Sequence, residues 1–227
     1  MLMKNLKTLF LKTESSQRFS NKLKNRENSY GTMIGKGLTD QTMNSLAERF
    51  SSPKTEREYR DRVIFLLASS TGLRAKELVN LRFSSIIESP EGEKIVRYVK
   101  KGGSVGYAVI LEEILEEVRE YHDSCDICSD YFILTLLMKN RKERIPLSTR
   151  GLQMIIGNWD VKTAAGKKIH PHSIRHTVGQ RIFDQFGSIA AQKILGHTSP
   201  NTTSNFYTRP YFNPGNSLLW YQPKQRV

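Results

Sequence analysis

Residues 55–81 read TEREYRDRVIFLLASSTGLRAKELVNL, and this stretch decides the fold class. Its apolar residues between positions 59 and 68 recur at helical spacing and cover a wide face, which predicts a buried helix over 55–70. Thr71 and Gly72 end that helix, and a second short helix is expected from 75 to 81. Arg74 therefore lies at the junction of two helices and is flanked by apolar runs.

The neighbouring segments extend this helical pattern and add one small sheet. Thr39 or Asp40 is a good N-cap for a helix that runs to about residue 50, where Ser-Ser-Pro breaks it. Residues 94–99 and 107–111 are β-rich and enclose the turn sequence KGGS. The sequence thus predicts a mainly α fold with a small antiparallel β-hairpin.

The second half of the chain is again helical. Helices are expected over 112–122, with one apolar face, and over 152–159. Pro171 suits the first turn of a helix that runs through residue 186. Gly187 stops that helix, and Ser188 caps another that ends at 195–196. Residues 141–150 are expected to form a loop or short strand, with Ser148 as a candidate cap.

Charge is high and unevenly distributed. The 227 residues carry 35 Lys and Arg against 22 Asp and Glu, a net charge of +13. Residues 1–36 have a net charge of +6, residues 37–140 of −3 and residues 141–227 of +10. A chain this basic attracts polyanions, of which nucleic acid is the commonest. The composition excludes a disordered or fibrous protein.

Other classes are excluded by what the sequence lacks. No apolar run reaches the roughly 20 residues that span a bilayer, and lysines interrupt the N-terminus too often for a secretory signal. The two cysteines, Cys125 and Cys128, cannot make a disulfide framework. They form a CxxC pair, but no second ligand pair with zinc spacing follows, so no metal site is expected.

The reactive side chains gather near the C-terminal end. Four of the five histidines lie within 170–197, in HPHSIRHT (170–177) and LGH (195–197), and Tyr207 follows. Paired arginines can clamp the non-bridging oxygens of a phosphodiester, while a Lys or His protonates the leaving oxygen. A tyrosine can attack the phosphorus where positive neighbours favour the phenolate. His172 and Arg175, three residues apart, share one helix face.

The sequence resembles the tyrosine recombinases of the phage integrase family over about residues 38–210. Four pieces carry the resemblance in the family's order: TGLRAKELVNLRFSSI (71–86), VKKGG (99–103), HPHSIRHT (170–177) and LGHTSPNTTSNFYTR (195–209). The resemblance implies the catalytic-domain fold of DNA breaking and rejoining enzymes. It also implies strand exchange through a 3′-phosphotyrosyl link to double-stranded DNA, with no metal or other cofactor.

The resemblance also implies a role for each matching residue. Arg74 and Arg175 would be the phosphate-clamping pair, and Glu77 an acidic residue that supports them. His172 would be the acid/base histidine and His197 the second histidine. Lys101 would be the general acid in the hairpin turn, with Lys100 as the competing assignment. Tyr207 would be the nucleophile.

Two departures from the family pattern matter. The ten residues from His197 to Tyr207 exceed the commonest spacing by one, which keeps Tyr211 open as a less favoured nucleophile. Only about 37 residues precede the resemblance, so the chain resembles short members that lack a full core-binding domain. Residues 1–37 are expected to be a basic arm or short helix that contacts phosphates.

The resemblance extends to partners and location. Residues 38–210 would be the catalytic domain, and residues 211–227 a tail that docks on a neighbouring protomer. A homotetramer on DNA is expected, with a monomer free in solution and no membrane partner. The protein would work on DNA in the cytoplasm of a prokaryotic cell, or for a virus or mobile element.

Three other functions remain open from the sequence. A monomeric type IB topoisomerase-like enzyme would use the same residues to relax DNA. A metal-dependent rolling-circle nuclease would use His170 and His172, but its motif lies on a central strand, where the proline between them is disfavoured. A non-catalytic DNA-binding protein derived from a recombinase is the third. His170 and His176 are expected to be structural, and His122 to lie at the surface.

Overall fold

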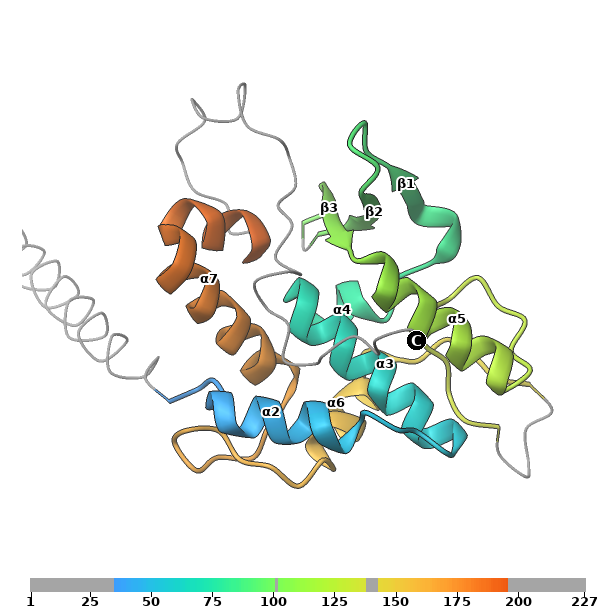
Figure 1. Ribbon diagram of the computed structural model, residues 1–227, viewed down its shortest axis with the longest axis horizontal. Helices are drawn as coiled ribbons and strands as arrows, with labels where there is room; N and C mark the ends of the chain where they lie inside the picture. The colour runs from blue at the N-terminus through green and yellow to red at the C-terminus, as the bar shows by residue number, and fades with distance from the viewer. Residues whose placement is uncertain (1–34, 101, 138–142, 196–227) are drawn as a thin grey trace, which may run out of the picture.

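The computed structural model of the protein describes residues 35–100, 102–137 and 143–195 (Figure 1). Its helices are α2 (Asp40–Arg49), α3 (Glu56–Thr71), α4 (Ala75–Leu78), α5 (Glu112–Ser124), α6 (Thr149–Gly157) and α7 (Pro171–Leu195), with a short 3-10 helix η1 (Phe83–Ser85). The strands β1 (Ile86–Glu88), β2 (Lys94–Val99) and β3 (Val105–Ile110) form one antiparallel sheet in that order. The fold is therefore mainly helical with one small sheet, as predicted.

Helix α3 is the central element of the described structure. It packs against α5, α7 and β3, and in Figure 1 it crosses between α2 and α6 below and the sheet with α5 beside it. The side chains from Val63 to Thr71 are all buried, which matches the apolar run in the sequence. Thr55 caps its start in a reciprocal pair of bonds with Glu58, and this capping box fixes where the helix begins.

An aromatic cluster fills the core below α3. Trp159 lies 5.0 Å from Phe50 and 6.2 Å from Phe65, between ring centroids, and the two phenylalanines lie 5.7 Å apart. Buried aromatic groups in these arrangements add to the free energy of folding beyond the area that they bury. The cluster joins the end of α2, the middle of α3 and the end of α6.

Gly187 divides α7 into two helices, as the sequence predicted. Its φ of 78° and ψ of −178° lie in a region that only glycine adopts readily. Helix α7 therefore turns sharply at this residue.

Within the described ranges, no helix is long and apolar enough to cross a membrane.

The structure corrects two helix boundaries and adds one strand. Helix α6 begins at Thr149, not 152, because the Ser148 side chain accepts from the backbone N–H of Gly151 and caps it there. Helix α4 ends at Leu78, not 81, because the N–H groups of Asn80 and Leu81 bond three residues back and tighten the chain into a turn. Strand β1, which the sequence did not predict, pairs residues 86–88 with 94–96.

The prediction for His122 was wrong. The residue is buried, 6% exposed, and its Nε2 lies 3.1 Å from the backbone oxygen of Phe132. The Phe83 ring packs edge-on against it, with 5.3 Å between ring centroids. Burial lowers the pKa of His122, so the ring is a neutral core residue.

Candidate active site

The loop between α3 and α4 positions the first candidate arginine. Gly72 ends α3 with a φ of 62°, and its backbone N–H donates to Ala68. A side chain at this position would meet Cγ1 of Val178 at 2.9 Å, so glycine also lets α7 approach the loop closely. The chain then enters α4 with Arg74 as its N-cap residue.

Glu77 holds Arg74 in place through two atoms. One carboxylate oxygen accepts from the Arg74 backbone N–H at 2.8 Å, and the other accepts from its guanidinium at 3.1 Å. Glu77 is only 3% exposed, whereas the side chain of Arg74 is 26% exposed. The buried carboxylate therefore fixes a guanidinium whose free edge still reaches solvent.

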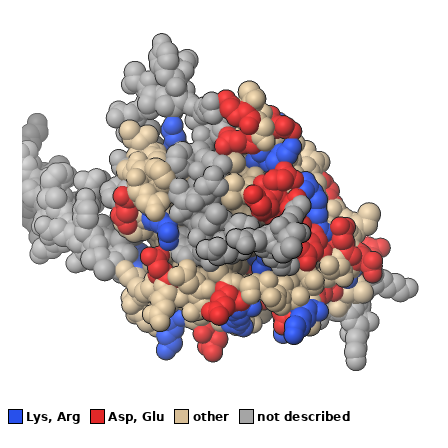
Figure 2. Space-filling model, in the orientation of Figure 1, with Lys and Arg blue, Asp and Glu red and all other residues tan. Residues whose placement is uncertain are grey.

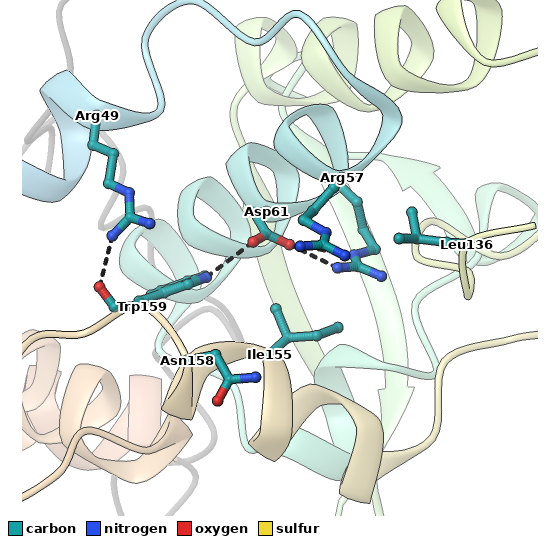
Figure 3. A pocket seen from close by; sticks show the side chains of 8 residues that line it. Arg49, Arg57, Asp61, Leu136, Ile155, Asn158 and Trp159 are labelled. Carbon is teal, nitrogen blue, oxygen red and sulfur yellow. Dashed lines mark hydrogen bonds and ion pairs between the residues drawn. The ribbon is translucent and has the colours of Figure 1, made fainter.

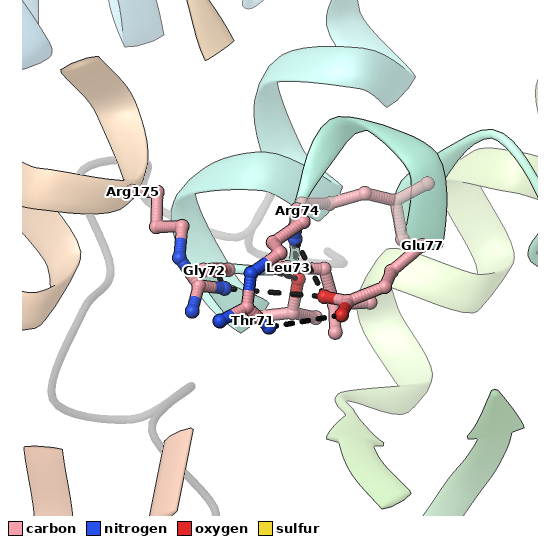
Figure 4. A network of polar contacts seen from close by, with 7 residues as sticks. Thr71, Gly72, Leu73, Arg74, Glu77 and Arg175 are labelled. Carbon is pink, nitrogen blue, oxygen red and sulfur yellow. Dashed lines mark hydrogen bonds and ion pairs between the residues drawn. The ribbon is translucent and has the colours of Figure 1, made fainter. Parts of the chain in front are cut away.

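Arg175 reaches the same carboxylate from α7. Its guanidinium donates to the backbone oxygen of Gly72 at 2.6 Å and lies 3.9 Å from Glu77 (Figure 4). Arg175 is 5% exposed. Residues separated by a hundred positions in the chain thus converge, and the structure brings together Arg74, Glu77 and Arg175.

The electrostatics of this cluster favour an incoming anion. Burial and, next in size, the nearby charge of Arg74 together lower the pKa of Arg175 to about 10, while Glu77 opposes the shift. Two guanidinium groups share one carboxylate, so one positive charge is uncompensated among these three side chains. A bound oxyanion would relieve the repulsion between the two arginines.

His172 lies on the first turn of α7, one turn before Arg175, and is exposed. Its ring stands between His170 and His176, at 6.4 and 5.3 Å between ring centroids. Burial lowers the pKa of His176, and the charge of His172 lowers it further. His176 is therefore an uncharged, partly buried neighbour near pH 7, whereas His172 and His170 are both exposed.

The hairpin places Lys100 beside an unpredicted tyrosine. A side chain at Gly106 would meet Cε of Lys100 at 2.7 Å and the Tyr98 ring at 2.5 Å, so both lie over the glycine. Tyr98 is 8% exposed. Burial raises its pKa to about 12, and Glu77 adds to the shift while the two site arginines oppose it. Tyr98 thus lies close to the arginine cluster.

One feature of the sequence could have indicated that Tyr98 lies near the candidate site. It lies two residues before Lys100, and alternate residues of a strand share a face, which puts Tyr98 on the same side of the hairpin as Lys100.

Four other proposed residues lie outside the described residues: Lys101, His197, Tyr207 and Tyr211. The arm over 1–34 and the segment 196–227 lie outside them as well. Cys125 and Cys128 are unbridged, and the described residues contain no group of His, Cys, Asp and Glu that could hold a metal ion.

Comparisons with known proteins agree on one family. The sequence model of the phage integrase family matches residues 36–213. The tyrosine recombinase XerC of Staphylococcus aureus is 28% identical over 153 residues, which are 67% of this chain and 50% of that protein. The XerC of Staphylococcus haemolyticus is 27% identical over 169 residues, 74% of this chain and 54% of that protein.

Solved structures show the same fold. The crystal structure of the XerA recombinase has a TM-score of 0.55 and 27% identity, covering 74% of this chain and 57% of that one. The XerH recombinase bound to its difH substrate has a TM-score of 0.52 and 20% identity, covering 76% of this chain and 50% of that one. The chain spans about half the length of the curated relatives that it matches.

Proposed function

Because the chain belongs to the phage integrase family, we propose that it is a site-specific DNA recombinase that cuts and rejoins DNA through a 3′-phosphotyrosyl intermediate. The observation that carries the proposal is the convergence of Arg74 and Arg175 on Glu77. A pair of guanidinium groups beside a buried carboxylate suits a phosphodiester, whose negative charge grows as the nucleophile attacks. The XerC relatives, named as tyrosine recombinases, support the same activity.

Each further residue has a proposed step. Tyr207 attacks the phosphorus, the DNA 3′-oxygen stays on that phosphorus, and the 5′-oxygen leaves with a proton. Lys101 or Lys100 supplies that proton, and the position of Lys100 over Gly106, beside Tyr98, supports Lys100 as a real competitor. His172 on α7, as the acid/base residue, accepts the proton of the Tyr207 hydroxyl, and His197 hydrogen-bonds the phosphate or the leaving group. The phosphodiester energy stays in the covalent link, so the step needs no external energy source.

The wider assignments are part of the same proposal. Residues 38–210 form the catalytic domain, residues 1–37 a basic arm on DNA, and residues 211–227 a tail on a neighbouring protomer. Four protomers assemble on two double-stranded sites, because strand exchange needs two duplexes. The protein then works wherever its DNA substrate lies, which for the bacterial relatives is the cytoplasm.

The test is covalent capture on DNA. The protein is incubated in EDTA with a pool of duplexes of random sequence. Each carries a nick, so that the short fragment with the new 5′-hydroxyl diffuses away and cannot rejoin. We expect wild type to become attached to DNA through Tyr207, identified by peptide mapping, and Tyr207→Phe to bind DNA without attachment. Tyr211→Phe is the matched control and should behave as wild type.

Other outcomes would contradict parts of the proposal. Attachment that persists in Tyr207→Phe and disappears in Tyr211→Phe moves the nucleophile to Tyr211. Attachment that requires added divalent metal contradicts the metal-free mechanism. Relaxation of supercoiled plasmid by a protein that stays monomeric on DNA in sedimentation favours a topoisomerase-like enzyme over a recombinase.

A further inference from the structure

A recess on the opposite end of α3 from Arg74 is lined by three arginines, and we propose that it is a second phosphate-binding site. It has a volume of about 330 Å³ and lies between the end of α2, the first turns of α3 and the end of α6 (Figure 3). Its lining residues are Arg49, Arg57, Arg60, Asp61, Leu136, Ile155, Asn158 and Trp159. This site goes beyond the recombinase function proposed above.

The single carboxylate of the recess is fully engaged. One oxygen of Asp61 accepts from Nε and Nη2 of Arg60, at 3.3 and 3.0 Å. The other oxygen accepts from the Trp159 indole N–H at 3.3 Å. Burial raises the pKa of Asp61, and the charges of Arg60 and, more weakly, of Arg57 oppose the shift. Asp61 therefore offsets only one of the three positive charges that line the recess.

The two other arginines form no close ion pair with a carboxylate within the described ranges. Arg49 donates to the backbone oxygen of Trp159 at 2.6 Å, which fixes the guanidinium at the mouth of the recess but leaves its charge uncompensated. Arg57 is exposed and forms no hydrogen bond or ion pair with another described residue. It lies one turn before Arg60 on α3, so both guanidinium groups face the same recess.

This arrangement selects an anion with several oxygen acceptors. Guanidinium groups bind phosphate through paired N–H donors, and several guanidinium groups around one recess can each bind a different oxygen of a phosphate group, which a carboxylate with two oxygens matches less well. The phosphate would come from outside the chain, either as a DNA backbone group or as free phosphate.

The recess is distinct from the candidate active site. Arg60 and Gly72 are twelve residues apart on α3, which is about 18 Å along a helix axis. One phosphate cannot contact both places, whereas one DNA duplex is long enough to reach both. Binding at the recess can therefore be measured without any cleavage step, so its failure is separate from failure of the recombinase proposal.

The test is a titration with inorganic phosphate at constant ionic strength, followed by NMR chemical shifts of the Trp159 indole N–H. We expect saturable binding to wild type, binding at least tenfold weaker to Arg57→Gln, and binding within twofold of wild type for Arg119→Gln. Arg119 is an exposed arginine on α5 that pairs with Glu112 at 2.7 Å, so its loss changes net charge equally.

DNA binding distinguishes the two sources of phosphate. A salt slope that is smaller by about one for Arg57→Gln than for Arg119→Gln identifies a DNA backbone phosphate. An equal slope with weakened phosphate binding identifies free phosphate. The proposal is overturned if phosphate binding does not saturate, or if Arg57→Gln and Arg119→Gln weaken phosphate binding equally. It is also overturned if Arg57→Gln changes only self-association, which would assign the recess to a protein interface.

Discussion

Tyr121 presents a hydroxyl to the core of the protein without a hydrogen-bond partner among the described residues. The residue is completely buried in α5, and burial raises the pKa of its phenol. An unpaired buried hydroxyl costs about 1–3 kcal/mol of desolvation free energy. The unpaired Tyr121 hydroxyl therefore lowers the stability of the folded protein.

Tyr121→Phe should therefore raise the free energy of unfolding, by about 1 kcal/mol, because it removes the unpaired group and keeps the ring. Urea unfolding followed by far-ultraviolet circular dichroism measures this change. Tyr131→Phe is the control, since the Tyr131 hydroxyl accepts from Arg82 and its removal should be neutral or destabilising. A less stable Tyr121→Phe would mean that the hydroxyl has a partner.

Glu77 helps to keep the buried Arg175 protonated beside Arg74. The charge of Glu77 opposes the burial and the charge of Arg74 that together lower the pKa of Arg175 to about 10. Glu77→Gln removes that charge, so Arg175 should lose its proton at a lower pH than in wild type, and DNA affinity should fall earlier as pH rises from about 8 to about 10.5. Fluorescence anisotropy with a labelled duplex, measured across this pH range, follows the loss of DNA affinity.

The same substitution should also reduce stability, because it leaves a buried arginine without its counter-charge; the cost is about 1–3 kcal/mol. Glu116→Gln is a matched control, because it removes an acidic side chain from α5. If DNA affinity falls at the same pH in wild type and in Glu77→Gln, Glu77 does not set the charge of Arg175.

At the scale of elements, local sequence signals predicted most of the helices and the hairpin. The 3.6-residue period placed α3 and α5, and Gly187 marked the break in α7. Strand β1 was missed because three residues, IIE, are too short to show alternation, and they form a strand only through pairing with β2. Signals confined to one segment cannot report a partner from another.

The candidate site was also predicted only in part, because the contacts that complete it join segments far apart in the sequence. The resemblance identified Arg74, Glu77 and Arg175, and the structure brings them together. The burial of His122 was missed because Phe83 and Phe132 cover it from other segments. Tyr98 was missed because its place near the arginines depends on a glycine in the facing strand.

Gly187 carries the bend of α7, and its backbone angles are costly for any other residue. Gly187→Ala should destabilise the helix after the bend by about 1–3 kcal/mol, through backbone strain alone. Nothing lies within 4 Å of a side chain built there, so a clash does not contribute. Hydrogen exchange should become faster over residues 188–195 and stay unchanged in α3. Gln185→Ala, an exposed substitution just before the bend, should leave both unchanged.

At the scale of the whole molecule, charge is segregated along the chain. The acidic residues of the middle segment gather over α5 and the β1–β2 side of the face shown in Figure 2. Residues 1–36 carry a net charge of +6 and residues 141–227 of +10. A polyanion is attracted to basic segments and repelled by acidic ones, so we expect this distribution of charge to strengthen the binding of the proposed DNA substrate at low salt.

The basic N-terminal segment should therefore add salt-dependent affinity without adding chemistry. Replacing Lys22, Lys24 and Arg26 with Gln should reduce the slope of log affinity against log salt by up to about 2.7, at about 0.9 for each DNA phosphate that is no longer neutralised. Covalent capture at saturating protein should stay at the wild-type level, because the substitutions lie outside the arginine cluster. Replacing Glu14 and Glu27 with Gln is the opposite control and should strengthen binding. Loss of capture at saturation would instead place this segment in the catalytic step.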